Sequence, residues 1–302
     1  MPSPQRSTTT PRITSRQRHL LSLLASLGGS AGRLDFQKLL FLYCQELGSP
    51  PYEFVPYRYG AFSFTSYADC RKLVDRGFLE DTDAAWALTA VGEQAAGTTQ
   101  DLELEVFVRG QRLRGDALVA ETYRRFPYFA TRSEIAERVL DGDGRAMSRI
   151  EAARPTRKRA ALLTIGYEGK SLEGYLNQLL RAGVSILCDV RRNPLSRKYG
   201  FSKRSLAGAC EKVGIRYEHL PELGIASAKR KGLEARAEFD RLFAEYSRDT
   251  LPNQKPSVDR IQRWVAGGEA VALTCYELEP VDCHRHCVSD ALVQSGVKVT
   301  HL

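Results

Sequence analysis

From residue 160 to the end of the 302-residue chain, short apolar runs alternate with amphipathic segments. The apolar runs predict five strands, at 161–165, 184–190, 215–219, 271–275 and 297–301. Strands that alternate with helices are typical of a mainly parallel sheet with helices on both faces. The sequence therefore predicts a Rossmann-like α/β domain over 160–302. No GxGxxG motif follows its first strand, so a dinucleotide ligand is not predicted.

The N-terminal half has a different pattern. Its predicted elements are three helices followed by two short strands around a polar turn, at 16–25, 34–47, 67–75, 78–80 and 86–88. This order is typical of a winged-helix domain, which either binds nucleic acid or serves as a structural or dimerising module. We expect a mostly α winged-helix-like domain at 16–100, preceded by a disordered basic tail at 1–15. A helical bridge and a basic linker are expected at 101–159.

The amino-acid composition indicates which class of partner the protein binds and which cellular compartment suits it. The chain has 44 Lys and Arg against 36 Asp and Glu, a net charge of +8 that suits nucleic acid or another polyanion. Its seven cysteines are an odd number and widely spread, which favours reduced thiols over a disulfide framework. The sequence has no run of 18 apolar residues and no signal core, so we expect a cytoplasmic protein without a membrane segment.

Polar side chains follow several of the predicted strands. The carboxyl ends of parallel strands meet at one edge of a sheet, where ligands bind. Asp189 and Glu277 are expected there as an acid and a base, and Arg191 and Arg285 as clamps for a phosphate or carboxylate. Alternatively, Asp189 pairs with an arginine and caps the next segment. The substrate-binding candidates are Tyr167, Glu168, Arg191, Arg192, Tyr199, Tyr276 and Arg285.

A Cys-His-Arg sequence opens the helix predicted after the fourth strand. The catalytic candidates are Asp189, Glu277, Cys283 and His284. Cys283 is included because a thiol at a helix N-terminus has a lowered pKa. Neighbours on a helix point about 100° apart, so a direct pair between Cys283 and His284 is not expected. A closed zinc site usually takes two ligand pairs, and no second CxxC-type pair exists. We therefore predict no cofactor and assign no metal ligand; a metal near Cys275, Cys283 and His284 is the alternative.

The segment 191–203 contains several cations and two aromatic residues but no acid. Cations suit phosphates and aromatic rings suit base stacking, so this pattern favours nucleic-acid binding. The alternative is an ordinary solvated face. The nucleic-acid-binding candidates are Arg197, Lys198, Lys203 and Arg204.

Five stretches of the C-terminal half resemble the domain-of-unknown-function family 488. They are TIGYEGKS (164–171), DVRRNPLSRKYGFSK (189–203), YEHLPELG (217–224), CYELEPVDCHR (275–285) and VTHL (299–302). The resemblance implies a Rossmann-like fold with a polar pocket, and some members occur near DNA-modification or defence genes. Residues 35–80 are loosely similar to winged-helix-like domains of the Panacea and YwgA-like type, which occur near toxin–antitoxin and phage-defence systems.

These features predict a nucleic-acid-associated protein. The leading hypothesis is an enzyme that acts hydrolytically on a nucleic-acid base or nucleotide-like substrate, in DNA modification or phage defence. DNA is expected as the partner in preference to RNA, and a homodimer is one of the oligomeric states that the sequence leaves open. The alternative is a non-catalytic DNA-binding regulator or sensor, with a small-ligand or metal pocket in the C-terminal domain.

Overall fold

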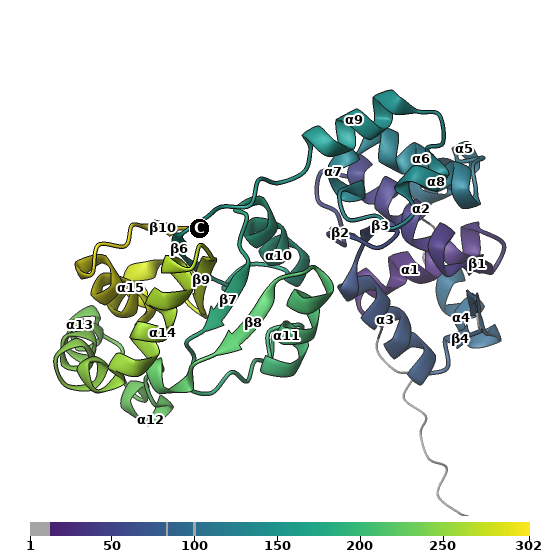
Figure 1. Cartoon of the computed structure of the whole chain (residues 1–302). Helices are drawn as coiled ribbons and strands as arrows, with labels where there is room; N and C mark the ends of the chain where they lie inside the picture. Colours follow the sequence, from purple (N-terminus) through teal and green to yellow (C-terminus); the bar gives the residue numbers. More distant parts are fainter. Residues whose placement is uncertain (1–12, 83, 99–100) are drawn as a thin grey trace, which may run out of the picture. The chain divides into compact units, whose positions relative to one another are not determined.

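The computed structural model describes residues 13–302 except 83, 99 and 100. The chain forms two compact units, residues 1–151 and 152–302, and Figure 1 labels most of their helices and strands.

The second unit contains a five-stranded parallel sheet in the order β10-β6-β9-β7-β8. Its strands are β6 (Ala161–Gly166), β7 (Ile186–Asp189), β8 (Arg216–His219), β9 (Ala270–Cys275) and β10 (Val299–His301). The central strands β7 and β9 are buried along their whole length, as is usual for a parallel sheet covered on both faces. This confirms the predicted α/β Rossmann-like fold.

Helices cover both faces of this sheet. Leu162, Ile186 and Val271 share one core with α13, α14 and α15, whereas Thr274, on the opposite side of β9, accepts a hydrogen bond from Tyr175 of α10. Ser171 caps α10, as predicted. The helices are α10 (Leu172–Arg181), α11 (Lys203–Lys212), α12 (Ser227–Arg230), α13 (Arg236–Glu245), α14 (Lys255–Ala266) and α15 (Arg285–Gln294). Three short 3-10 helices are η1 (Pro221–Leu223), η3 (Leu251–Gln254) and η4 (Pro280–Asp282), and η2 (Tyr246–Thr250) is a short π-helix.

The first unit contains the helices and the hairpin that the sequence predicts for it. The helices α1 (Ser15–Ser26), α2 (Arg33–Glu46) and α3 (Phe64–Asp75) precede the antiparallel pair β4 (Leu79–Asp81) and β5 (Ala85–Leu88). Two strand pairings were not predicted, because three-residue strands are too short to show a period. They are β1 (Ser30–Gly32), which pairs with β5, and the hairpin of β2 (Val55–Tyr57) and β3 (Gly60–Phe62). The winged-helix assignment stays a prediction.

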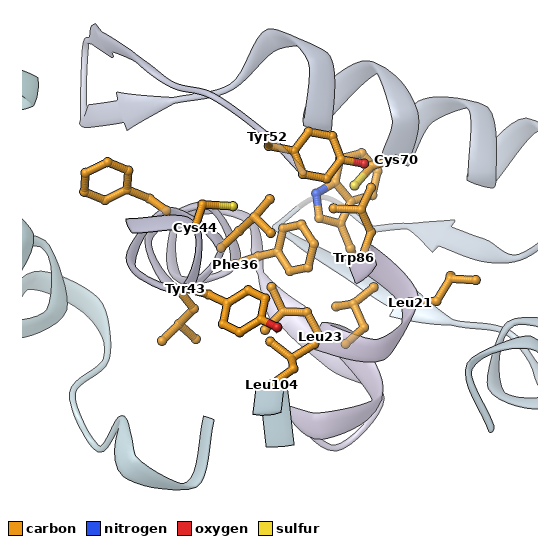
Figure 2. Close-up of a cluster of buried hydrophobic side chains, with 14 of the residues drawn as sticks. Leu21, Leu23, Phe36, Tyr43, Cys44, Tyr52, Cys70, Trp86 and Leu104 are labelled. Atoms are coloured by element: carbon orange, nitrogen blue, oxygen red, sulfur yellow. The ribbon is translucent and has the colours of Figure 1, made fainter. Parts of the chain in front are cut away.

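The core of the first unit is built largely from α1 and α2. Figure 2 shows Leu23 of α1 close to Phe36 and Tyr43 of α2, with Trp86 of β5 beside Phe36 and Leu21 at one end of the same core. Phe36 and Trp86 are fully buried. The core also takes in the first part of the segment expected as a bridge, through Leu104, Phe107 and Leu118.

That segment is helical, as expected, and its helices belong to the first unit. They are α5 (Leu102–Gly110), α6 (Gly115–Arg125), α7 (Pro127–Ala130), α8 (Ala136–Val139) and α9 (Gly144–Ala152), preceded by α4 (Ala90–Gly97). The expected tail at 1–15 falls mostly outside the described residues. Thr14 caps α1, and its backbone N–H in turn donates to the Gln17 side chain. Over the ranges that the structure describes, no helix combines the length and apolarity that a membrane crossing requires.

Candidate functional site

Two thiols and an imidazole meet at the carboxyl end of β9. Cys275 is the last residue of β9, and Cys283 and His284 immediately precede α15. The Nδ1 atom of His284 lies 3.8 Å from the Sγ atom of each cysteine, and the three atoms all lie within 4.8 Å of one another. Each of the three residues is only 1 % exposed. We call these residues the thiol–imidazole cluster.

The expectation that Cys283 and His284 do not pair was wrong. It assumed that both residues are helical, but Cys283 has φ −137° and ψ 135°, an extended conformation, and α15 begins only at Arg285. The thiol and the ring can therefore turn toward each other. Cys287, one helical turn on, lies elsewhere: its Sγ atom contacts His286 Nε2 at 3.4 Å.

The hydrogen bond of Nε2 shows that this nitrogen of the His284 ring carries a hydrogen. His284 Nε2 lies 3.0 Å from the carbonyl oxygen of Val190, at the end of β7. A carbonyl oxygen only accepts hydrogen bonds, so Nε2 carries a hydrogen and donates it. The other nitrogen, Nδ1, is the one that faces the two sulfurs.

The three groups of the cluster also shift one another's pKa values. A hydrogen bond from Cys283 and the nearby His284 ring lower the pKa of the Cys275 thiol well below its ordinary value. Burial and the Cys275 sulfur raise the pKa of Cys283. Burial alone would lower the pKa of His284, but the negative charge on Cys275 raises it overall. Cys275 is therefore the thiol that loses its proton first.

Glu277 lies two residues beyond Cys275, and its side chain is 21 % exposed. Its Oε1 atom accepts a hydrogen bond of 3.1 Å from Arg230 of α12. Its Oε2 atom is buried and has no hydrogen-bond partner among the described residues. Burial and the Cys275 sulfur raise the pKa of Glu277. Arg230 belongs to a basic run in the sequence, but only the fold reveals this contact.

Asp189 is fully buried at the end of β7, and both carboxylate oxygens are occupied. Oδ1 accepts from the backbone N–H and Nε of Arg191, at 3.0 and 2.8 Å, and Oδ2 accepts from Arg191 Nη2 at 2.5 Å. The Tyr217 hydroxyl also donates to Oδ2, at 2.6 Å. Arg191 in turn donates to the Tyr167 hydroxyl and the Phe201 carbonyl. The structure thus shows the alternative, an internal ion pair, and not a carboxylate open to a substrate.

Arg285 is also committed to the fold. It is fully buried and donates to the carbonyl oxygens of Glu277 and Leu278, at 2.5 and 2.7 Å. It therefore holds the loop after β9 and does not face solvent as a phosphate clamp would. The loop packs closely on the end of β6, because a Cβ atom at Gly166 would lie 1.8 Å from the Glu277 carbonyl oxygen.

The aromatic candidates divide into a buried and an exposed set. Tyr167 is 3 % exposed and stacks on Phe201, with ring centroids 4.4 Å apart, so its ring faces are not open to a base. Tyr276 forms a T-shaped pair with Tyr167 and is 46 % exposed, and Tyr199 is 41 % exposed. Glu168 is exposed and accepts a hydrogen bond from the Leu278 N–H.

The segment 191–204, a loop with the first two residues of α11, lies at the same edge as the cluster, and we call it the basic loop. Lys198 donates to the Tyr167 carbonyl oxygen at 3.1 Å, and the His284 bond to Val190 holds the start of the loop. Lys198 is partly buried. The exposed cations of the loop are Arg192, Arg197, Lys203 and Arg204.

The fold and the cluster define a Rossmann-like α/β domain with buried thiol and imidazole groups at the carboxyl edge of its sheet. Residues 171–292 match the family model described as "Domain of unknown function DUF488". The match confirms the resemblance of the C-terminal half, and the description carries no activity. No curated protein matches the sequence.

Proposed function

We propose that the protein is a nucleic-acid-associated enzyme that acts hydrolytically on a base or nucleotide-like substrate. The observation that carries this proposal is the basic loop, which lies at the same sheet edge as Glu277 and the thiol–imidazole cluster. Its exposed cations suit phosphates, and the exposed ring of Tyr199 suits a stacked base. The proposed setting is DNA modification or phage defence, in the cytoplasm, where free thiols stay reduced.

In this proposal, Glu277 and not Asp189 activates water or stabilises a cationic transition state. Asp189 already accepts four hydrogen bonds within the fold, so it positions the loop through Arg191. Glu277 keeps one carboxylate oxygen without a hydrogen-bond partner among the described residues, on a side chain that is 21 % exposed. A general base must reach the proton that it removes, and only an oxygen without a partner is ready to do so.

The test is to incubate the purified chain with plain and base-modified DNA and RNA oligonucleotides and to measure their masses. We expect a mass change with the native protein that Glu277→Gln reduces at least a hundredfold in rate. Glu279→Gln, on the same loop and exposed, is the matched control and should retain the native rate. Loss of activity in both variants, or in neither, would contradict the role of Glu277.

A non-catalytic regulator or sensor is the second candidate, and the burial of the cluster favours it. With each of its three side chains only 1 % exposed, the cluster is closed to a macromolecule in this conformation and suits a small ligand or a metal ion. This candidate predicts tight, salt-sensitive DNA binding with no mass change in any oligonucleotide.

A further inference from the structure

We propose that Cys275, Cys283 and His284 bind a zinc ion. This inference concerns the same sheet edge as the proposed function, but it needs no enzymatic activity and is tested by metal content alone. The sequence alone favoured no metal site, because it contains no second CxxC-type pair. The fold instead brings together one ligand from the end of β9 and two from the residues that immediately precede α15.

The spacing of the three ligand atoms suits a tetrahedral ion. With zinc–sulfur and zinc–nitrogen bonds of about 2.3 and 2.1 Å, sulfur and nitrogen ligands are about 3.6 Å apart, and two sulfurs about 3.8 Å. The two sulfur-to-Nδ1 distances are 3.8 Å, and no pair of ligand atoms exceeds 4.8 Å. Small side-chain rotations therefore suffice to seat the ion. Two thiolates with an imidazole favour zinc over magnesium or calcium, which prefer oxygen ligands.

The surroundings of His284 are those of a metal ligand. Histidines that bind a metal usually donate their other ring N–H to a carboxylate or a backbone carbonyl, which fixes the ring and leaves the ligating nitrogen free. His284 does this through Nε2 and Val190, and its Nδ1 atom faces both sulfurs. Cys275 is equally fixed, because it ends a buried strand that pairs with β6 and β7.

The fourth position is open to a water molecule, which the nearby Glu277 carboxylate would hold, because Glu277 itself is not among the residues whose ligand atoms lie within 4.8 Å of one another. The Oε2 atom of Glu277 is buried and has no hydrogen-bond partner in the described part of the chain. Arg230 binds the other oxygen of the same carboxylate. The charges of zinc and Arg230 together would balance those of two thiolates and one carboxylate, so the buried site needs no further counter-ion.

The test is the zinc content of the full-length protein, purified under reducing conditions without chelator and measured by elemental mass spectrometry. We expect one zinc ion per chain, and less than a tenth of that in Cys275→Ser and Cys283→Ser. The matched control is Cys287→Ser, which changes a buried cysteine of α15 outside the cluster and should keep the full zinc content. A zinc content that is equal in all three variants would overturn the proposal.

A second measurement covers the case in which the cluster variants do not fold. Native protein is stripped with chelator and titrated with cobalt(II), which should produce thiolate-to-cobalt charge-transfer bands and the visible bands of a tetrahedral ion. One equivalent of zinc should abolish them. A native protein that takes up neither metal, or that forms a disulfide between Cys275 and Cys283 in place of binding, would overturn the proposal. Zinc binding without a mass change in any oligonucleotide would refute only the proposed activity.

Discussion

At the scale of single residues, some ionisable groups form hydrogen bonds and ion pairs that stabilise the fold, whereas others remain available for binding or catalysis. Asp189 and Arg191 satisfy each other inside the protein, and Arg285 holds two backbone carbonyls. Glu277 keeps an unpartnered oxygen among the described residues, and the cluster keeps Nδ1 and two sulfurs together. Residue type alone does not reveal this division, because the partners come from other strands and loops.

Asp189→Asn should destabilise the second unit by about 3–5 kcal/mol, because it leaves the buried charge of Arg191 uncompensated. Urea unfolding followed through Trp264 in a Trp86→Phe background measures this, since the chain has one tryptophan in each unit. Glu211→Gln, on the exposed side of α11, is the control and should change the free energy of unfolding by less than about 0.5 kcal/mol. Equal effects of the two substitutions would show that the ion pair does not stabilise the fold.

Lys38 in α2 makes the stability of the first unit depend on pH. It is 2 % exposed, donates to the Ala61 carbonyl at 2.9 Å, and burial lowers its pKa to about 7. Between pH 7 and 10 the unfolded chain binds this proton and the folded chain does not, so stability should rise with pH, by at most about 1.4 kcal/mol per unit. Lys38→Met should remove this rise between pH 7 and 9, as measured by urea unfolding through Trp86. The same pH dependence of the free energy of unfolding in the native protein and in Lys38→Met would contradict this role of Lys38.

At the scale of elements, the site depends on how closely the loop after β9 approaches β6. Gly166 ends β6 in close contact with the Glu277 and Leu278 backbone, and Arg285 at the start of α15 donates to the carbonyl oxygens of the same two residues. The loop is thus fixed between a strand end and a helix start. Gly224 has a similar role on the neighbouring segment, because a Cβ atom there would lie 2.0 Å from the Arg192 nitrogen.

Gly166→Ala should therefore displace the loop and destabilise the second unit by about 1–3 kcal/mol, because the added Cβ meets backbone atoms that cannot rotate away. The matched control should change the free energy of unfolding in the opposite direction. Gly208→Ala in α11 meets no atom within 4 Å and should stabilise the protein by up to about 1 kcal/mol through helix propensity. Both changes are read from urea unfolding through Trp264, and a neutral Gly166→Ala would refute the close approach.

At the scale of the whole molecule, periodicity predicted the elements well, but it could not predict their side-chain partners. The alternation of apolar runs and helical segments identified all five strands of the sheet and the edge where Cys275 and Glu277 lie. The prediction that Cys283 and His284 do not pair failed, because Cys283 is extended and precedes α15, so its thiol can face the His284 ring. Periodicity also gave no sign that Lys38 is buried, because a lysine in an amphipathic helix normally reaches solvent.

The central claim is that the basic loop and the groups around Glu277 act on one nucleic-acid substrate. The most direct test is the mass of base-modified and plain oligonucleotides after incubation with the native protein, Glu277→Gln and Glu279→Gln. The proposal predicts a mass change with the native protein and Glu279→Gln that Glu277→Gln loses. Unchanged masses with the native protein, despite salt-sensitive binding of the same oligonucleotides, would contradict the enzyme and favour the regulator.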